Sequence, residues 1–188
     1  MDLSYVHLVN QGGYSQINTG TALASSASAA DISPGGSTLG QAFTFPADSL
    51  QPGQQYRVRS KGIVSNTGTP NLTLGVYYGG VAGTALCTTG ALATVTSLSN
   101  NLWTLEADIR VSGTVGTSGS IYALGSVAGP FASTAFMPAT SSSGNLVASL
   151  DTSVAKILTV GATWGTSSAS NSIQVILFTV ERLDEGAS

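Results

Sequence analysis

The residue types that most often carry catalysis are scarce in this chain. Nucleophilic catalysis by serine or cysteine needs a basic partner, and His7 is the only histidine. No Gly-x-Ser-x-Gly segment is present to display a serine on a sharp turn. Cys87 is the only cysteine, so the chain offers neither an internal disulfide nor the several His and Cys ligands of a zinc site. We expect His7 to be structural or exposed and Cys87 to be buried, and we predict no enzyme activity, no cofactor and no metal site.

One pair of carboxylates has a spacing that could support acid–base chemistry. Glu106 and Asp108 are two residues apart, which on a strand places them on one face at roughly 6–7 Å. Glycosidases hold their two carboxyl groups at a similar separation. Arg110 continues the same series, however, and catalytic carboxylates would need a deep cleft lined with aromatic side chains. We therefore favour salt-bridged carboxylates over a catalytic pair.

These charged residues belong to segments in which polar and apolar side chains alternate, the pattern of a half-buried strand. Leu102–Val111 is the clearest case, and Gln55–Asn66 and Asn71–Tyr78 follow the same pattern. Further strands are expected at Leu3–Asn10, Gly119–Val127, Ala155–Trp164 and Asn171–Leu183. The predicted core consists of large apolar residues on these strands: Leu72, Leu74, Val76, Trp103, Leu105, Ile109, Val111 and Trp164.

The rhythm of strands and turn residues, without sustained helical periodicity, indicates the fold class. Short strands at this spacing are typical of an antiparallel β-sandwich or barrel. The segment Gly12–Gly40 has no strong pattern, and we expect an extended arm or loop with little core content there. The sequence predicts an N-terminal strand and arm over residues 1–37 and a β-sandwich domain over residues 38–188.

A second expectation concerns the charges on two of the strands. Opposite charges on neighbouring strands stabilise a sheet and help to fix its register. We predict that the two strands lie side by side with their charged faces on the same side. The alternative is two unrelated solvated faces. The expected cross-strand cluster consists of Arg57, Arg59, Lys61, Glu106, Asp108 and Arg110.

Composition limits the classes of partner. Charged residues make up only 8% of the chain, half of the residues are Gly, Ala, Ser or Thr, and the net charge is −3. Six basic residues and a pI of about 4.7 oppose nucleic-acid binding. No apolar stretch is long enough to predict a membrane span, and the start of the chain lacks the features of a secretory signal. A nearly neutral surface gives copies little charge repulsion, so we expect self-association.

One apolar loop has no strand pattern. Phe131, Phe136 and Met137 lie within Gly129–Gly144, between prolines. A loop this hydrophobic needs cover, either over the end of the sandwich or against a neighbouring copy. It is a candidate interface loop, although the roles of this segment and of Gly12–Gly40 stay open.

Taken in order, several segments resemble the jelly-roll structural domains of tailed-bacteriophage virion proteins, such as head decoration, minor capsid and fibre proteins. The resemblance covers about Thr38 to Leu183 and is weaker before residue 38. The segments that carry it are Phe45–Gly53, Tyr56–Gly62, Thr67–Leu74, Gly79–Thr84, Trp103–Ala107 and Ala162–Asn171.

This resemblance implies a jelly-roll β-sandwich that forms trimers and docks on other virion proteins, such as the major capsid protein. It implies a location in the virion after assembly in the host cytoplasm, and no cofactor. A capsid decoration or minor capsid protein is the first expectation. The alternative is a tail fibre or spike module that binds a host receptor or glycan, which exposed aromatic residues in a groove would favour. Head or tail location, copy number and host are not indicated by the sequence.

Overall fold

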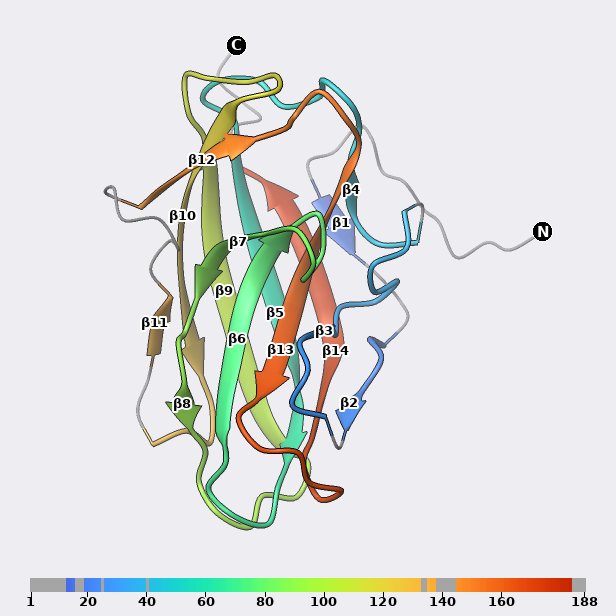
Figure 1. Cartoon of the computed structure of the whole chain (residues 1–188), viewed down its shortest axis with the longest axis vertical. Coiled ribbons are helices and arrows are strands. Elements are labelled where there is room, and N and C mark those ends of the chain that lie inside the picture. Colours follow the sequence, from blue (N-terminus) through green and yellow to red (C-terminus); the bar gives the residue numbers. More distant parts are fainter. Residues whose placement is uncertain are drawn as a thin grey trace, which may run out of the picture.

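The computed structural model describes residues 13–15, 19–24, 26–39, 41–132, 135–137 and 145–183. The described residues form antiparallel strands and turns, with two sheets packed face to face as a β-sandwich (Figure 1). The predicted strand Leu3–Asn10 and His7 lie outside these residues. The strands are β1 (Gly13–Ser15), β2 (Leu23–Ala24), β3 (Ala30–Asp31), β4 (Thr44–Phe45), β5 (Gln55–Ser65), β6 (Asn71–Tyr78), β7 (Thr84–Thr88), β8 (Leu92–Ala93), β9 (Asn101–Val111), β10 (Gly119–Ala128), β11 (Ala135–Met137), β12 (Leu146–Leu150), β13 (Lys156–Trp164) and β14 (Ser172–Arg182).

The two sheets differ in size. The large sheet has the order β1-β14-β5-β9-β10-β11, with β2 beside β14 and β12 beside β10. The small sheet has the order β3-β13-β6-β7, with β4 beside β13 and β8 beside β6. In the large sheet the last strand, β14, lies beside the first long strand, β5. The all-β antiparallel sandwich is therefore confirmed, whereas jelly-roll connectivity stays a prediction.

The core lies between the facing sides of the two sheets. It contains the eight residues that the sequence places there, four from the small sheet and four from the large sheet, each no more than 2% exposed. Alternation explains why they were identifiable, since every second residue of a half-buried strand points inward. Strand β7 was missed because Leu86 and Cys87, two consecutive buried residues, break that alternation.

The N-terminal segment contributes more to the core than the sequence suggested. Leu23 on β2 and Ile32 after β3 are buried members of the core, and Ile32 is fully enclosed. β2 pairs with β14 in the large sheet, and β3 pairs with β13 in the small sheet. The expectation of an arm with little core content is wrong for these residues, because two short pairings tie the segment to both sheets.

The apolar loop also differs from the expectation. Phe131 and Met137 are buried in the chain's own core, whereas Phe136 is 77% exposed. Phe131 forms a bridge with Thr94, and β11 pairs with β10 at the edge of the large sheet. Two of the three candidate interface residues therefore cover the sandwich itself, and only Phe136 is available to another molecule.

The outer face of the small sheet is covered by the chain. Thr159, which points outward from β13, is fully buried and donates a hydrogen bond of 2.6 Å to the Asp31 carboxylate. The backbone N–H of Val81 donates to the same carboxylate oxygen at 3.0 Å. The turn that carries Val81 is thus held against β3 and β13 on the outer side of this sheet. The large sheet is different, because its outward side chains are mostly exposed.

Candidate interaction surface

The outer face of the large sheet is the most chemically distinctive surface among the described residues. On β5 and β9, buried residues alternate with residues that are exposed or half-buried, so one side of the sheet faces the core and the other faces solvent. The antiparallel register then sets which outward side chains meet. Below, "outer face" means the solvent side of β5, β9, β10 and β14.

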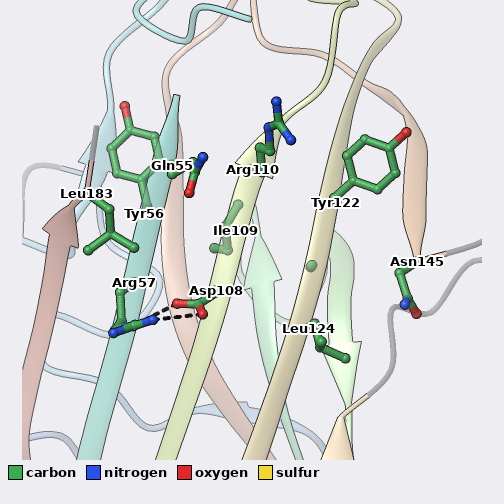
Figure 2. A pocket seen from close by; sticks show the side chains of 11 residues that line it. Gln55, Tyr56, Arg57, Asp108, Ile109, Arg110, Tyr122, Leu124, Asn145 and Leu183 are labelled. Carbon is green, nitrogen blue, oxygen red and sulfur yellow. Dashed lines mark hydrogen bonds and ion pairs between the residues drawn. The ribbon is translucent and has the colours of Figure 1, made fainter. Parts of the chain in front are cut away.

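A ladder of ion pairs crosses the middle of the outer face. Arg57 is bidentate to Asp108, with Nε–Oδ1 and Nη2–Oδ2 distances of 2.7 and 2.9 Å. Arg59 Nε donates to Glu106 Oε2 at 2.8 Å, and its Nη1 lies 3.4 Å from Glu181 Oε2 on β14. We call these five residues the ion-pair ladder. Figure 2 shows the Arg57–Asp108 pair between β5 and β9.

The predicted pairing of these two strands is present in the structure. Arg57 lies opposite Asp108 and Arg59 opposite Glu106 in the β5–β9 register. The hydrogen bond from Arg57 to Asp108, helped by the charges of the nearby carboxylates, raises the pKa of Arg57 above its usual value. Glu106 and Asp108 are both engaged by arginines on an open sheet, which suits register fixing better than catalysis. Glu181 was missed, although it continues the same outward series on the last strand.

Two members of the predicted cluster stay outside the ladder. Lys61 lies opposite Thr104 on one side and Leu177 on the other. Arg110 lies opposite Gln55 and Tyr122. Neither has a carboxylate within ion-pair distance among the described residues. The outer face therefore carries four basic side chains against three acidic ones, whereas the whole chain has a net charge of −3.

An apolar patch occupies one end of the outer face. Ile63 lies opposite Leu102, and Leu177 lies opposite Lys61, so these three side chains come from three adjacent strands. Leu102 is 77% exposed and Leu177 is 57% exposed. Leu177 faces outward because a bulge between Val175 and Leu177 shifts the alternation of β14 by one residue. We call Ile63, Leu102 and Leu177 the apolar patch.

A shallow hollow occupies the other end of the outer face (Figure 2). Its volume is about 360 Å³. Arg110 and Tyr122 stand on neighbouring strands at its rim. Tyr122 is 44% exposed. The lining residues are Gln55, Tyr56, Arg57, Asp108, Ile109, Arg110, Tyr122, Ala123, Leu124, Asn145 and Leu183.

The remaining reactive groups are isolated. Cys87 is fully buried, and burial raises the pKa of its thiol to about 12. No cluster of three or more His, Cys, Asp or Glu side chains that could hold a metal ion occurs among the described residues. In the same part of the chain, no helix is long and apolar enough to cross a membrane.

Comparison with protein-family models, with curated proteins and with solved structures gave no match for this chain.

Proposed function

We propose that the chain is a structural protein of a bacteriophage particle, a capsid decoration or minor capsid protein. In this proposal it forms trimers through the apolar patch on the outer face of the large sheet and docks on other virion proteins, such as the major capsid protein. It works by contact rather than by catalysis. The virion assignment is supported by the resemblance of the sequence and by its low content of charged residues.

The distribution of exposed apolar side chains is the observation that carries the assembly role. Ten large hydrophobic side chains are exposed in the described part of the chain, and six of them lie on or beside one sheet. Scattered exposed hydrophobic residues are ordinary, but a concentration on one face marks an interaction surface. Leu102 and Leu177 form the patch that carries the assembly role; the other four are Phe136 on the edge strand β11, and Tyr122, Leu124 and Leu183, which line the hollow.

Burial of the patch would stabilise an assembly. Fully burying an exposed leucine contributes about 1.5–3 kcal/mol, so Leu102 and Leu177 together offer several kcal/mol per copy. The ion-pair ladder beside the patch satisfies its own charges, which lowers the desolvation cost of bringing a second surface close. Homo-oligomers usually have closed point-group symmetry, and a three-fold ring, which the resemblance implies, is one such arrangement.

Sedimentation velocity over a range of protein concentrations tests the assembly role. The wild-type chain is expected to sediment as a trimer, and the double variant Leu102→Asp, Leu177→Asp as a monomer. Leu39→Asp is the matched control, because Leu39 is 60% exposed but lies outside both sheets. A wild-type monomer at every concentration, or loss of the trimer in the control as well, would contradict the proposed interface.

One observation favours a second function, that of a fibre or spike module which binds a host glycan. Tyr122 presents an exposed aromatic ring at the rim of a hollow, and Gln55 and Asn145 bring amide groups to the same hollow. An aromatic surface with convergent polar groups is a common arrangement in ligand sites. Binding of the wild-type chain to a glycan array, lost in Tyr122→Ala, is the expected result if this function holds.

A further inference from the structure

The hollow contains a guanidinium whose charge the described protein does not neutralise. Arg57 and Arg59 are both held by carboxylates of the ladder, at 2.7 and 2.8 Å. Arg110, two residues along β9 from Asp108, is exposed and forms no ion pair among the described residues. Asp108 is held by Arg57 and lies outside ion-pair distance of Arg110. The hollow thus combines an unpaired cation with an aromatic ring on the next strand.

We propose that this hollow binds an acidic saccharide, with the sugar carboxylate on Arg110 and the sugar ring against Tyr122. The proposal rests on the second function above and gives it a ligand class. A guanidinium presents paired N–H donors that match the two oxygens of a carboxylate, and such charge-assisted bonds are stronger than neutral ones. Tyr122 lies directly opposite Arg110 in the β9–β10 register, so one small ligand can reach both.

The shape and lining of the hollow suit a sugar ring. A volume of about 360 Å³ is at the lower end of the range for small-molecule sites, about 300–1,000 Å³. Leu124 lies opposite Asp108 on the neighbouring strand and is 53% exposed, so it offers an apolar side chain against which one face of a ring can rest. Asn145, at the far side of the hollow in Figure 2, carries an amide that can donate to and accept from hydroxyl groups.

The site is compatible with assembly through the apolar patch. Leu102 and Arg110 are eight residues apart on the same strand, which corresponds to about 27 Å. A neighbouring copy seated on the patch therefore leaves the hollow accessible.

A glycan array with sialylated, uronic-acid, sulfated and neutral members first selects the acidic ligand that binds most tightly. Isothermal titration calorimetry then tests the proposal by comparing that acid with an uncharged counterpart. Two candidate pairs are sialyllactose with its methyl ester, and an oligogalacturonide with its methyl ester, because each pair differs only in the carboxylate. The wild type is expected to bind the acid at least tenfold more tightly than its uncharged counterpart. Arg110→Gln is expected to abolish this preference, and Arg110→Lys to retain part of it.

The matched control is Lys61→Gln, which removes the other unpaired cation of the outer face outside this hollow. It is expected to bind like the wild type, and circular dichroism checks that each variant is folded. Equal affinity for the acid and its ester, equal losses in Arg110→Gln and Lys61→Gln, or preference for the sulfated members overturns the carboxylate site. Binding of neutral glycans that depends on Tyr122 but not on Arg110 would overturn this inference and leave the glycan-binding function standing. No binding to any glycan would overturn both.

Discussion

Gly62 marks the closest approach of two strands in the centre of the large sheet, and replacing it tests the packing of that sheet. It lies opposite Trp103 on β9 and Val175 on β14. A Cβ at this position would lie 1.9 Å from the carbonyl oxygen of Gln174 and 2.9 Å from Nε1 of Trp103. Ordinary non-bonded contacts are about 3.5–4.0 Å, so Gly62→Ala must displace the backbone of β14 by roughly 1.5 Å.

The expected cost of Gly62→Ala follows from this displacement. Overpacking of a core costs about 1–3 kcal/mol, and each weakened hydrogen bond of the sheet adds about 1 kcal/mol, so we expect a loss near 3 kcal/mol. With a urea dependence of about 2–3 kcal/mol per M, the unfolding midpoint falls by about 1–1.5 M. Fluorescence reports the transition, because Trp103 and Trp164 are each 1% exposed.

Gly113→Ala provides the comparison. A Cβ at Gly113 meets nothing within 4 Å, and its φ is not positive. The variant is expected to be unchanged or stabilised by up to about 1 kcal/mol, because alanine restricts the unfolded chain. A Gly62→Ala variant within about 0.5 kcal/mol of wild type would refute the argument from close approach.

Three further predictions concern the core, the buried acids and the ladder. Phe178→Ala is expected to cost about 3–5 kcal/mol in urea unfolding of the monomeric Leu102→Asp chain, in which the proposed trimer contact is absent. In the same background Leu177→Ala, at the exposed position next to the bulge, should change stability by no more than about 0.5 kcal/mol; similar losses would show that the bulge is misplaced. Burial raises the pKa of both Cys87 and Tyr78 to about 12. As the pH rises, the unfolded chain therefore loses these protons before the folded chain does, so the free energy of unfolding should fall between about pH 9 and pH 12. Native Cys87 should also resist alkylation at about pH 8. Rapid alkylation, or stability that is flat up to about pH 12, would argue against the burial. Arg59→Gln should lower the melting temperature more at 0.01 M salt than at 1 M, because salt screens exposed ion pairs. Lys61→Gln, the control, should show no such dependence on salt. A salt-independent effect of Arg59→Gln would indicate that the side chain stabilises the sheet by packing instead.

The sequence was sufficient to predict the strands that are buried on one face, but not strand β7. β6 ends where the alternation of Asn71–Tyr78 ends, and the facing charges of β5 and β9 indicated their pairing. Residues Leu86 and Cys87 on β7 are both buried, so no period of two was visible. Strands buried on both faces lose the contrast on which the sequence pattern depends.

The surface was less accessible to sequence reasoning than the core. The bulge that turns Leu177 outward begins opposite Gly62 on the neighbouring strand, and Phe131 and Met137 pair with Thr94 and Gly125, so neither feature is visible in a single strand pattern. The apolar patch and the hollow each combine side chains from at least three strands. A single strand pattern indicates which residues face solvent, but the register and order of strands decide which of them meet.

The proposed role is tested most directly by imaging purified particles of the phage that encodes this chain, at a resolution that traces individual side chains. The proposal expects several copies of the chain in the particle, with Leu102 and Leu177 of each copy covered by a neighbouring copy. Particles that lack the chain, or that contain it with the apolar patch facing solvent, would contradict the proposal.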